Sequence, residues 1–318
     1  MPSYRSSLTP ITLGTWGLGD ASNDCRAYHR IDPETAINVI IYAIDKGINF
    51  FDTAPAYGNG NSEIRLGQAI QKTSTQPLVS TKAGWPNFAN PPDYSNATIL
   101  KNLSQSIERI GYVDMLMLHL EGKINTQTAK NAGRLLEELK KSKMLNAIGV
   151  ACKAPADLKF WCDYADWDIA SINFNMLDLR AIEHNIFELA KRYNIDLVCR
   201  TPLAMGFLAQ AYPPQHQFAA HDIRSSFNSR RINSFIKGAK IAMKLAQQDD
   251  IALWPLTAVR FCLSFKAIKS VIVGSCSINE LKAYLPALDG LGLSDEVVQK
   301  IIEANIQINP DGHLTANI

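Results

Sequence analysis

Residues 46–67 read Lys-Gly-Ile-Asn-Phe-Phe-Asp-Thr-Ala-Pro-Ala-Tyr-Gly-Asn-Gly-Asn-Ser-Glu-Ile-Arg-Leu-Gly, and this stretch decides the fold. An apolar run ending at Phe51 predicts a short buried strand, and residues typical of turns follow it directly. Asp52 stands where the strand ends, Tyr57 lies in the loop behind it, and a helix is predicted to begin near Ser62. A carboxylate at the carboxyl end of a strand, with a phenol in the next loop, is typical of the catalytic mouth of a barrel. For this fragment alone, a plain strand-turn-helix whose Asp52 only caps the backbone is an equally open interpretation.

The same unit, a strand followed by a helix, recurs along the chain. Strands are predicted over residues 12–18, 48–51, 78–81, 112–118, 147–150, 169–174, 197–199 and 271–273. Helices are predicted over 32–47, from 62 onward, and over 98–110, 129–141, 155–164, 181–193, 231–248, 256–264, 278–285 and 296–304. This alternation predicts parallel strands joined by right-handed crossovers.

Eight such units in 318 residues fit a closed (β/α)8 TIM barrel, which we predict as a single α/β domain over residues 1–318. A doubly wound open sheet is the alternative. Against it, no Gly-x-Gly-x-x-Gly follows a strand, and Gly14, Gly17 and Gly19 have the wrong spacing. Residues 203–228 show no clean periodicity, and a loop of this length inside a compact domain is usually a lid or a binding loop.

Composition excludes several classes of protein. A 47% apolar and 19% charged chain with a net charge of +2 is typical of a globular protein and does not favour nucleic acid or a membrane surface as partner. The six cysteines show no Cys-x-x-Cys spacing, which favours reduced thiols. No signal-type or membrane-length apolar run is present, so a cytoplasmic location is expected. The histidines at 29, 119, 184, 216, 221 and 313 lack the spacing of metal ligands, so we expect no metal site.

Four polar residues stand out by their positions. Asp52, Lys82 and His119 lie at the carboxyl ends of the second, third and fourth predicted strands, and Tyr57 lies in the loop after the second. In a barrel these strand ends share one mouth, so the four side chains should converge. A free phenol, with a pKa of about 10, is a weak acid at neutral pH, and a nearby ammonium makes it a better proton donor. The set therefore suits proton delivery to a carbonyl oxygen, with His119 placing that oxygen.

Each of these residues alone also has an ordinary explanation. A lysine or aspartate at a strand end is usually a surface charge or an ion-pair partner, and a histidine there is usually a polar residue at the edge of a core. Tyr57 could be one more partly buried aromatic side chain. The coincidence of all four at the functional end of successive units favours the catalytic interpretation.

The sequence resembles the aldo-keto reductase family, nicotinamide-dependent carbonyl reductases built on a (β/α)8 barrel. The resemblance rests on residues 13–19 (Leu-Gly-Thr-Trp-Gly-Leu-Gly), 52–58 (Asp-Thr-Ala-Pro-Ala-Tyr-Gly), 80–82, 115–119, 200–208 and 271–275. It implies that Tyr57 is the general acid, that Lys82 and Asp52 tune it, and that His119 orients the carbonyl. The implied reaction is hydride transfer between the nicotinamide and an aldehyde, ketone or sugar hemiacetal carbon.

The resemblance also implies a set of binding residues. The substrate-facing walls are expected to be Trp16, Trp85 and Phe88. Cofactor-binding positions are expected at Trp16, Ala151, Cys152, Ser171, Arg200, Thr201, Leu203, Gly206, Gly274, Ser275, Ser277, Glu280 and Tyr284. Many relatives open with a longer hairpin that closes the base of the barrel, and the ten residues before Ile11 are short for one.

The cofactor positions depart from the pattern of the family. Ala151, Cys152 and Ser171 replace the usual Ser-Asn pair and Gln that hold the carboxamide, and Arg200 stands where an aromatic ring often packs on the nicotinamide. Glu280 and Tyr284 stand where a basic residue and an Asn are usual. The resemblance implies NADP(H), whereas Glu280 would repel a 2′-phosphate and could accept hydrogen bonds from a free ribose diol, so NAD(H) is also possible. An arginine from the 203–230 loop could still bind the phosphate.

The predicted function is that of a carbonyl reductase or sugar-type dehydrogenase acting on a small carbonyl or sugar substrate, as a monomer or small homo-oligomer. The alternative is a regulatory or sensor barrel that binds the cofactor with little turnover. The altered cofactor positions favour that alternative slightly, and the complete set of Tyr57, Lys82, Asp52 and His119 opposes it.

Overall fold

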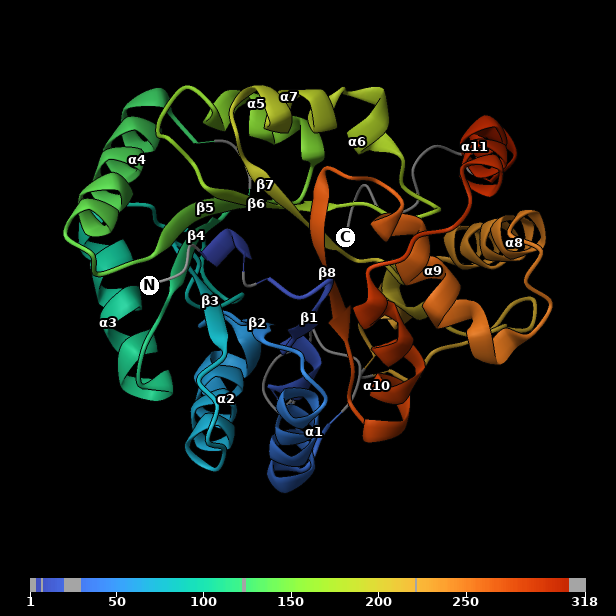
Figure 1. Cartoon of the computed structure of the whole chain (residues 1–318), viewed down its shortest axis with the longest axis horizontal. Helices are drawn as coiled ribbons and strands as arrows, with labels where there is room; N and C mark the ends of the chain where they lie inside the picture. The colour runs from blue at the N-terminus through green and yellow to red at the C-terminus, as the bar shows by residue number, and fades with distance from the viewer. Residues whose placement is uncertain (1–3, 7, 20–29, 122–123, 221, 309–318) are drawn as a thin grey trace.

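The computed structural model describes residues 4–6, 8–19, 30–121, 124–220 and 222–308, and its parallel strands close into one barrel in the order β1 to β8. Figure 1 shows the strands at the centre and the helices around them. The strands are β1 Ile11–Gly14, β2 Phe50–Asp52, β3 Leu78–Ala83, β4 Met115–His119, β5 Ala147–Cys152, β6 Ile169–Asn173, β7 Asp196–Arg200 and β8 Ile268–Gly274. The predicted (β/α)8 barrel is confirmed, and the open sheet is excluded. That residues 1–318 form one domain stays a prediction.

The helices of the outer layer follow the strands in turn. They are α1 Pro33–Asp45, α2 Asn61–Gln71, α3 Asn96–Ile110, α4 Thr126–Lys141, α5 Leu158–Trp161, α6 Arg180–Glu183, α7 Ile186–Arg192, α8 Ser229–Leu245, α9 Trp254–Leu263, α10 Ile278–Tyr284, α11 Asp295–Glu303 and α12 Asn305–Ile308. The start of α1 has ordinary capping chemistry, because the Asp32 side chain accepts a hydrogen bond from the Thr35 amide and Pro33 occupies the first helical position.

Three predicted elements differ in the structure. The strand predicted over 12–18 ends at Gly14, and Trp16–Leu18 forms a 3-10 helix instead. The Thr15 amide makes the last ladder bond to the Asp52 carbonyl, and the Thr15 carbonyl then accepts the Leu18 amide, which turns the chain. The helix predicted over 181–193 is divided into α6 and α7 by Asn185, whose φ is 56°. The helix predicted over 155–164 contains only the short α5 after a 3-10 turn.

The inside of the barrel has its own apolar core. Successive strand residues point to opposite faces, so alternate positions fill the barrel and the others meet the helices. The inner cluster consists of Phe50, Met115, Met117, Ala147, Ala151, Ile169 and Val198, together with Tyr4. These side chains fill the lower barrel, and polar side chains replace them toward the carboxyl ends of the strands.

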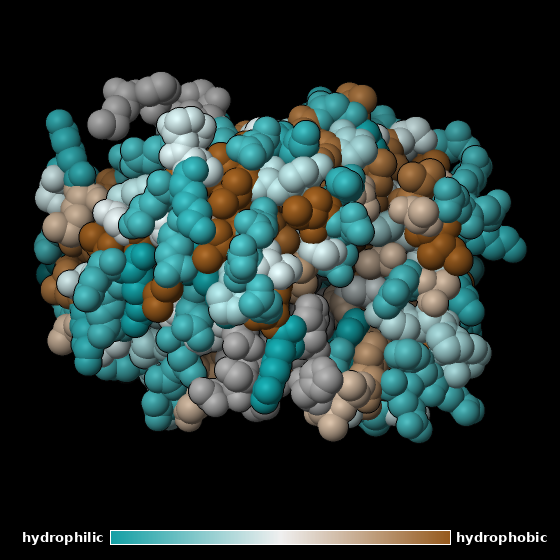
Figure 2. Space-filling view, turned by 90° about the horizontal axis from the view of Figure 1, so that it is seen from below, coloured by the Kyte–Doolittle hydropathy of each residue, from teal (hydrophilic) through white to brown (hydrophobic). Residues whose placement is uncertain are grey.

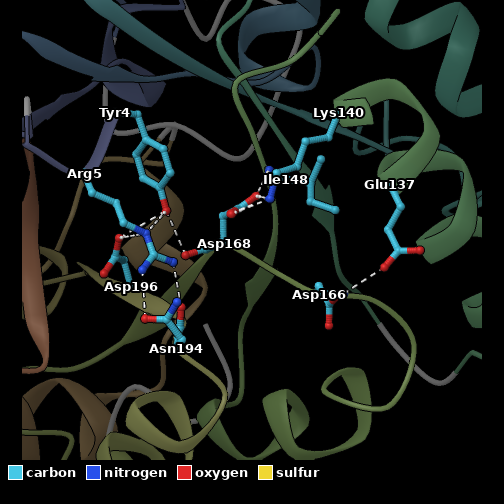
Figure 3. Close-up of polar contacts among 9 residues, drawn as sticks. All are labelled: Tyr4, Arg5, Glu137, Lys140, Ile148, Asp166, Asp168, Asn194 and Asp196. Atoms are coloured by element: carbon cyan, nitrogen blue, oxygen red, sulfur yellow. Dashed lines mark hydrogen bonds and ion pairs between the residues drawn. The ribbon is translucent and has the colours of Figure 1, made fainter. Parts of the chain in front are cut away.

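A short N-terminal segment closes the base of the barrel (Figure 3). Tyr4 belongs to a 3-10 helix over Tyr4–Ser6, and its hydroxyl lies 3.0 Å from the Asp168 carbonyl and 3.1 Å from the Asp196 carboxylate. Arg5 forms an ion pair of 3.2 Å with Asp196 and donates to Asn194. Burial raises the pKa of the Tyr4 hydroxyl above its usual value, and the negative charge of Asp196 raises it further. The hydroxyl therefore stays protonated and can donate a hydrogen bond. The residues before Ile11 are short for the hairpin found in many relatives, and the Tyr4 side chain fills the base of the barrel in its place.

The face shown in Figure 2 carries apolar side chains in separate groups between hydrophilic ones. Such scattered apolar groups are usual for a surface in contact with water. Over the described part of the chain, no helix is both long enough and apolar enough to cross a bilayer.

The contacts of Tyr4 predict a measurable loss of stability for Tyr4→Phe. The substitution keeps the ring in the barrel but leaves the Asp168 carbonyl and the Asp196 carboxylate without this donor, so we expect the free energy of unfolding to fall by about 1 kcal/mol. Urea unfolding followed by circular dichroism measures the change. Tyr193→Phe is the control, since Tyr193 is 41% exposed. Equal stability of the two variants would show that the polar contacts of the Tyr4 hydroxyl do not stabilise the base of the barrel.

Candidate active site

The four residues predicted from the strand ends converge at the barrel mouth. The Lys82 Nζ donates to Asp52 Oδ1 at 2.7 Å and to the Thr53 carbonyl at 2.8 Å, and Lys82 is only 2% exposed. The same Nζ lies 4.8 Å from the ring centroid of Tyr57. The rings of Tyr57 and His119 meet edge to face with centroids 6.0 Å apart. Proton donor, cation, carboxylate and imidazole thus surround one small region.

Burial and charge act in opposite directions on Lys82. Burial alone lowers the pKa of the amine, but the Asp52 carboxylate and then the Tyr57 oxygen raise it, and the balance leaves the pKa of Lys82 above its ordinary value of 10.5. Lys82 is therefore an ammonium at neutral pH. The second oxygen of Asp52, Oδ2, is buried and has no hydrogen-bond partner within the described chain.

Two glycines let the loop that carries Tyr57 approach the end of β1. Gly58 has a φ of 58°, and a Cβ built on it would lie 1.9 Å from the Gly19 carbonyl oxygen. A Cβ on Gly19 would in turn lie 2.9 Å from the Tyr57 backbone. Arg65 of α2 donates to the Leu18 carbonyl on the same turn. Gly19 is thus explained by backbone packing that holds Tyr57 over the mouth.

A cleft of about 1180 Å³ opens at this end of the barrel, with one aromatic wall. Trp85 lies 4.8 Å from Phe88 and 5.4 Å from His119, measured between ring centroids. Most of the predicted site residues line the cleft, namely Trp16, Asp52, Tyr57, Lys82, Trp85, Phe88, His119, Ser171, Arg200, Thr201, Leu203, Gly206, Gly274, Ser275, Glu280 and Tyr284.

Three predicted cofactor residues do not line the cleft. Ala151 belongs to the inner apolar cluster, whereas Cys152 belongs to the core between the strands and helices. The pKa of the Cys152 thiol is raised, chiefly by burial, so it stays protonated. The side chain of Ser277 is the N-cap of α10. Cys152 is displaced because adjacent strand residues point to opposite faces.

Ser277 and Glu280 form a variant of the capping box, in which Glu280 accepts the amide of the residue before the N-cap. The Ser277 hydroxyl accepts a hydrogen bond of 3.2 Å from the Glu280 amide, and Glu280 Oε2 accepts one of 2.7 Å from the Cys276 amide. This is the arrangement in which the third helical residue reaches back over the helix start. The Glu280 carboxylate therefore occupies one backbone donor, the Cys276 amide, that an anionic group could otherwise use.

Strand β6 carries two buried polar side chains without partners. The Ser171 hydroxyl and both polar atoms of the Asn173 amide form no hydrogen bond with the residues that the structure describes. Ser171 is 1% exposed and Asn173 is fully buried. The two lie two positions apart on one face of β6, and Asn173 is in register with Arg200. Sequence reasoning missed Asn173, although its spacing from Ser171 could have indicated it.

Arg224 is a second residue that the sequence did not single out, and it organises the loop after β7. Its guanidinium pairs with Asp222 at 2.6 Å, donates to the Met205 carbonyl at 3.0 Å and to the Tyr212 hydroxyl at 2.9 Å, and lies 4.1 Å from the ring centroid of Phe218. Met205 has a φ of 60°, as part of a left-handed run over 204–206. Arg224 thus fastens a strained part of the cleft wall.

Metal ligation finds no support among the described residues, which contain no group of three or more His, Cys, Asp or Glu side chains placed to hold an ion. His29, His221 and His313 lie outside the described residues. The described cysteines are free thiols, and Cys25 also lies outside the described residues.

Comparisons with known proteins agree with this geometry. The model of the Aldo/keto reductase family matches residues 10–306. The chain is 27% identical to L-galactose dehydrogenase of Arabidopsis thaliana over 308 residues, which cover 92% of this chain and 91% of that protein. It is 31% identical to the NADH-specific methylglyoxal reductase of Escherichia coli over 220 residues, which cover 64% and 66% of the two chains. A glycerol dehydrogenase structure from Gluconobacter oxydans matches with a TM-score of 0.78 and 23% identity over 96% of this chain and 93% of that chain.

The contacts of Arg224 predict that Arg224→Met loosens the loop over 203–228. The variant loses the ion pair and both donors that hold the left-handed run, so the amides of this loop should exchange with deuterium at least severalfold faster while those of the barrel strands do not change. Arg192→Met is the matched control, because Arg192 also lies over an aromatic ring, that of Tyr193, but is outside this loop and does not line the cleft. Unchanged exchange in Arg224→Met would show that the loop holds its shape without this side chain.

Proposed function

The chain belongs to the aldo/keto reductase family, and from this premise we propose that it transfers hydride between a nicotinamide cofactor and an aldehyde, ketone or sugar hemiacetal carbon. The observation that carries the proposal is the buried pair of Lys82 and Asp52, 2.7 Å apart, directly below the ring of Tyr57. A buried ammonium beside a phenol can stabilise the phenolate that remains after the phenol has given up its proton.

In this mechanism Tyr57 is the general acid. Its phenol donates a proton to the carbonyl oxygen as negative charge develops there, and the Lys82 ammonium stabilises the resulting phenolate. Asp52 and the Thr53 carbonyl hold that ammonium in place. His119, 6.0 Å from Tyr57 between ring centroids, places the substrate oxygen. The nicotinamide, when bound, supplies or accepts the hydride.

The cleft fits a nicotinamide dinucleotide, as three of its features indicate. The unpartnered Ser171 hydroxyl lines the cleft and offers a donor and acceptors of the kind that a primary carboxamide needs, and the Asn173 amide lies behind the cleft on the same face of β6. Arg200 contributes a planar guanidinium to the same cleft. Gly274 leaves open space, since a Cβ built on it would meet nothing within 4 Å.

We further propose a preference for NAD(H) over NADP(H). Glu280 already accepts the Cys276 amide at the start of α10, so its charge lies where a 2′-phosphate would require a cation. Arg224 does not supply that cation, because Asp222 neutralises it. One relative, the methylglyoxal reductase, is named as NADH-specific.

The walls of the cleft favour a small polyhydroxylated carbonyl substrate. Trp85 and Phe88 provide aromatic surface, and Lys153 and Glu121 line the same cleft as a half-exposed ion pair of 3.4 Å. An aromatic wall can cover the apolar face of a sugar-like molecule, while a charged pair can exchange hydrogen bonds with hydroxyl groups. A relative named L-galactose dehydrogenase is consistent with this class.

The first test is Tyr57→Phe, which removes only the phenolic proton donor. We expect kcat for aldehyde reduction to fall roughly 100- to 10,000-fold, while NADH binding, measured by fluorescence titration, stays within twofold. Tyr193→Phe is the control, as an exposed tyrosine that does not line the cleft. A wild-type protein that binds NADH but reduces no aldehyde, ketone or sugar would instead support the sensor barrel.

The cofactor preference is tested by Glu280→Arg. We expect the ratio of kcat/KM for NADPH to that for NADH to rise roughly tenfold or more, because a cation replaces an anion near the 2′-position. Glu280→Gln separates the two roles of this residue, since glutamine can still close the capping box without a charge. It should give a smaller rise at unchanged thermal stability. If neither variant alters the ratio, Glu280 does not select the cofactor.

A further inference from the structure

Three buried hydroxyl groups form a cluster directly behind the pair of Lys82 and Asp52. Thr15, Thr53 and Ser62 are each fully buried. The Ser62 hydroxyl lies 2.5 Å from the Thr15 hydroxyl, 3.1 Å from the Thr53 hydroxyl and 2.9 Å from the Thr15 carbonyl. The cluster therefore joins the end of β1, the end of β2 and the first turn of α2.

Ser62 is the centre of this cluster. A hydroxyl can donate one hydrogen bond and accept two. Ser62 reaches this limit when it donates to the Thr15 carbonyl and accepts from the hydroxyls of Thr15 and Thr53. Its removal would leave the buried Thr53 hydroxyl without its acceptor and would turn the Thr15 hydroxyl to the Asp52 carbonyl, 3.2 Å away, which is costly in a site that water does not reach.

The hydroxyl cluster holds the backbone of residues 52–53, whose Thr53 carbonyl binds the Lys82 ammonium. The Asp52 carbonyl accepts the Thr15 amide at 2.9 Å, and the Thr53 amide donates to the Ser80 carbonyl at 2.9 Å. The Thr53 carbonyl is then directed at Lys82 Nζ, 2.8 Å away. Thr53 is thus held at two points, its amide by the Ser80 carbonyl and its side chain by Ser62, and both are needed to fix the direction of its carbonyl.

The position of Ser62 argues against an ordinary capping role. The N-cap of α2 is Gly60, and no side chain caps that helix end. The helix is also anchored independently, since the buried Glu63 accepts hydrogen bonds from Thr81 at 2.6 Å, from Ser106 at 2.7 Å and from Arg109 at 2.8 Å. The Ser62 hydroxyl is thus not needed to start or to dock α2.

We propose that Ser62 is a positioning residue for carbonyl reduction, which acts through Thr15 and Thr53 to aim the Thr53 carbonyl at the Lys82 ammonium. This inference rests on the proposed function, in which that ammonium stabilises the Tyr57 phenolate. Without Ser62 the second acceptor of the cation moves, and the ammonium loses its fixed place below the Tyr57 ring.

The test compares Ser62→Ala and Thr53→Val with Ser270→Ala. The control removes a hydroxyl from another fully buried pair inside the barrel, Thr12 and Ser270, 2.6 Å apart, which does not contact residues 52–53. We expect kcat for aldehyde reduction to fall roughly 10- to 100-fold in both test variants, with KM for the aldehyde within twofold, because the acid is misplaced while the binding walls are intact. Ser270→Ala should lose comparable thermal stability and keep kcat. Thr53→Val preserves the shape of the side chain, so it remains informative should Ser62→Ala fail to fold.

A second measurement needs neither substrate nor turnover. In proton–nitrogen NMR spectra of the lysine ammonium groups at neutral pH, the Lys82 signal, identified by its loss in Lys82→Met, reports how fast its protons exchange with water. We expect the Lys82 ammonium protons to exchange with water faster in Ser62→Ala and Thr53→Val than in the wild type. In Ser270→Ala their exchange rate should not change. Unchanged exchange and unchanged kcat in the two test variants would overturn the positioning role. A wild-type protein without reductase activity would count against the proposed function, while the exchange rates would still decide the role of Ser62.

Discussion

A buried ammonium must keep hydrogen-bond acceptors, and this requirement at Lys82 organises the upper half of the barrel. An isolated charge at 2% exposure would be strongly unfavourable, so one carboxylate and one carbonyl must stay within hydrogen-bond distance. Both acceptors come from the end of β2. The hydroxyl cluster around Ser62 and the close contact of Gly19 with Gly58 can be understood as means of keeping that strand end and the following loop in place.

The loop after β7, which forms part of the cleft wall, shows how the fold accommodates an unfavourable backbone conformation. Left-handed conformations over 204–206 are costly for residues other than glycine, and Arg224 offsets that cost with hydrogen bonds to Met205 and Tyr212. At the far end of the barrel, Tyr4 closes the base with a single ring and two polar contacts (Figure 3). Tyr4 fills the base of the barrel, whereas the mouth at the opposite end opens into the cleft.

Much of the fold and the centre of the site could be predicted from local patterns. The alternation of strand and helix signals predicted the barrel, because each βα unit has its own periodicity and turn chemistry. The boundaries were less accurate where tertiary contacts intervene, as at Trp16–Leu18, a 3-10 helix followed by Gly19, which packs against the backbone of Tyr57 and Gly58. Cys152 was placed in the cofactor site, but its position next to Ala151 turns it to the outer face of β5.

The amino-acid sequence by itself determined the closed barrel and the meeting of Asp52, Tyr57, Lys82 and His119, since parallel strands bring their carboxyl ends to one mouth whatever the details of packing. Only the tertiary structure decided what surrounds them. That Tyr4 meets Asp168, that Ser62 meets Thr15 and that Glu63 meets Ser106 all depend on which atoms come within about 3 Å. Contacts of that range between distant segments leave no periodicity in the chain, so no pattern of residues could reveal them.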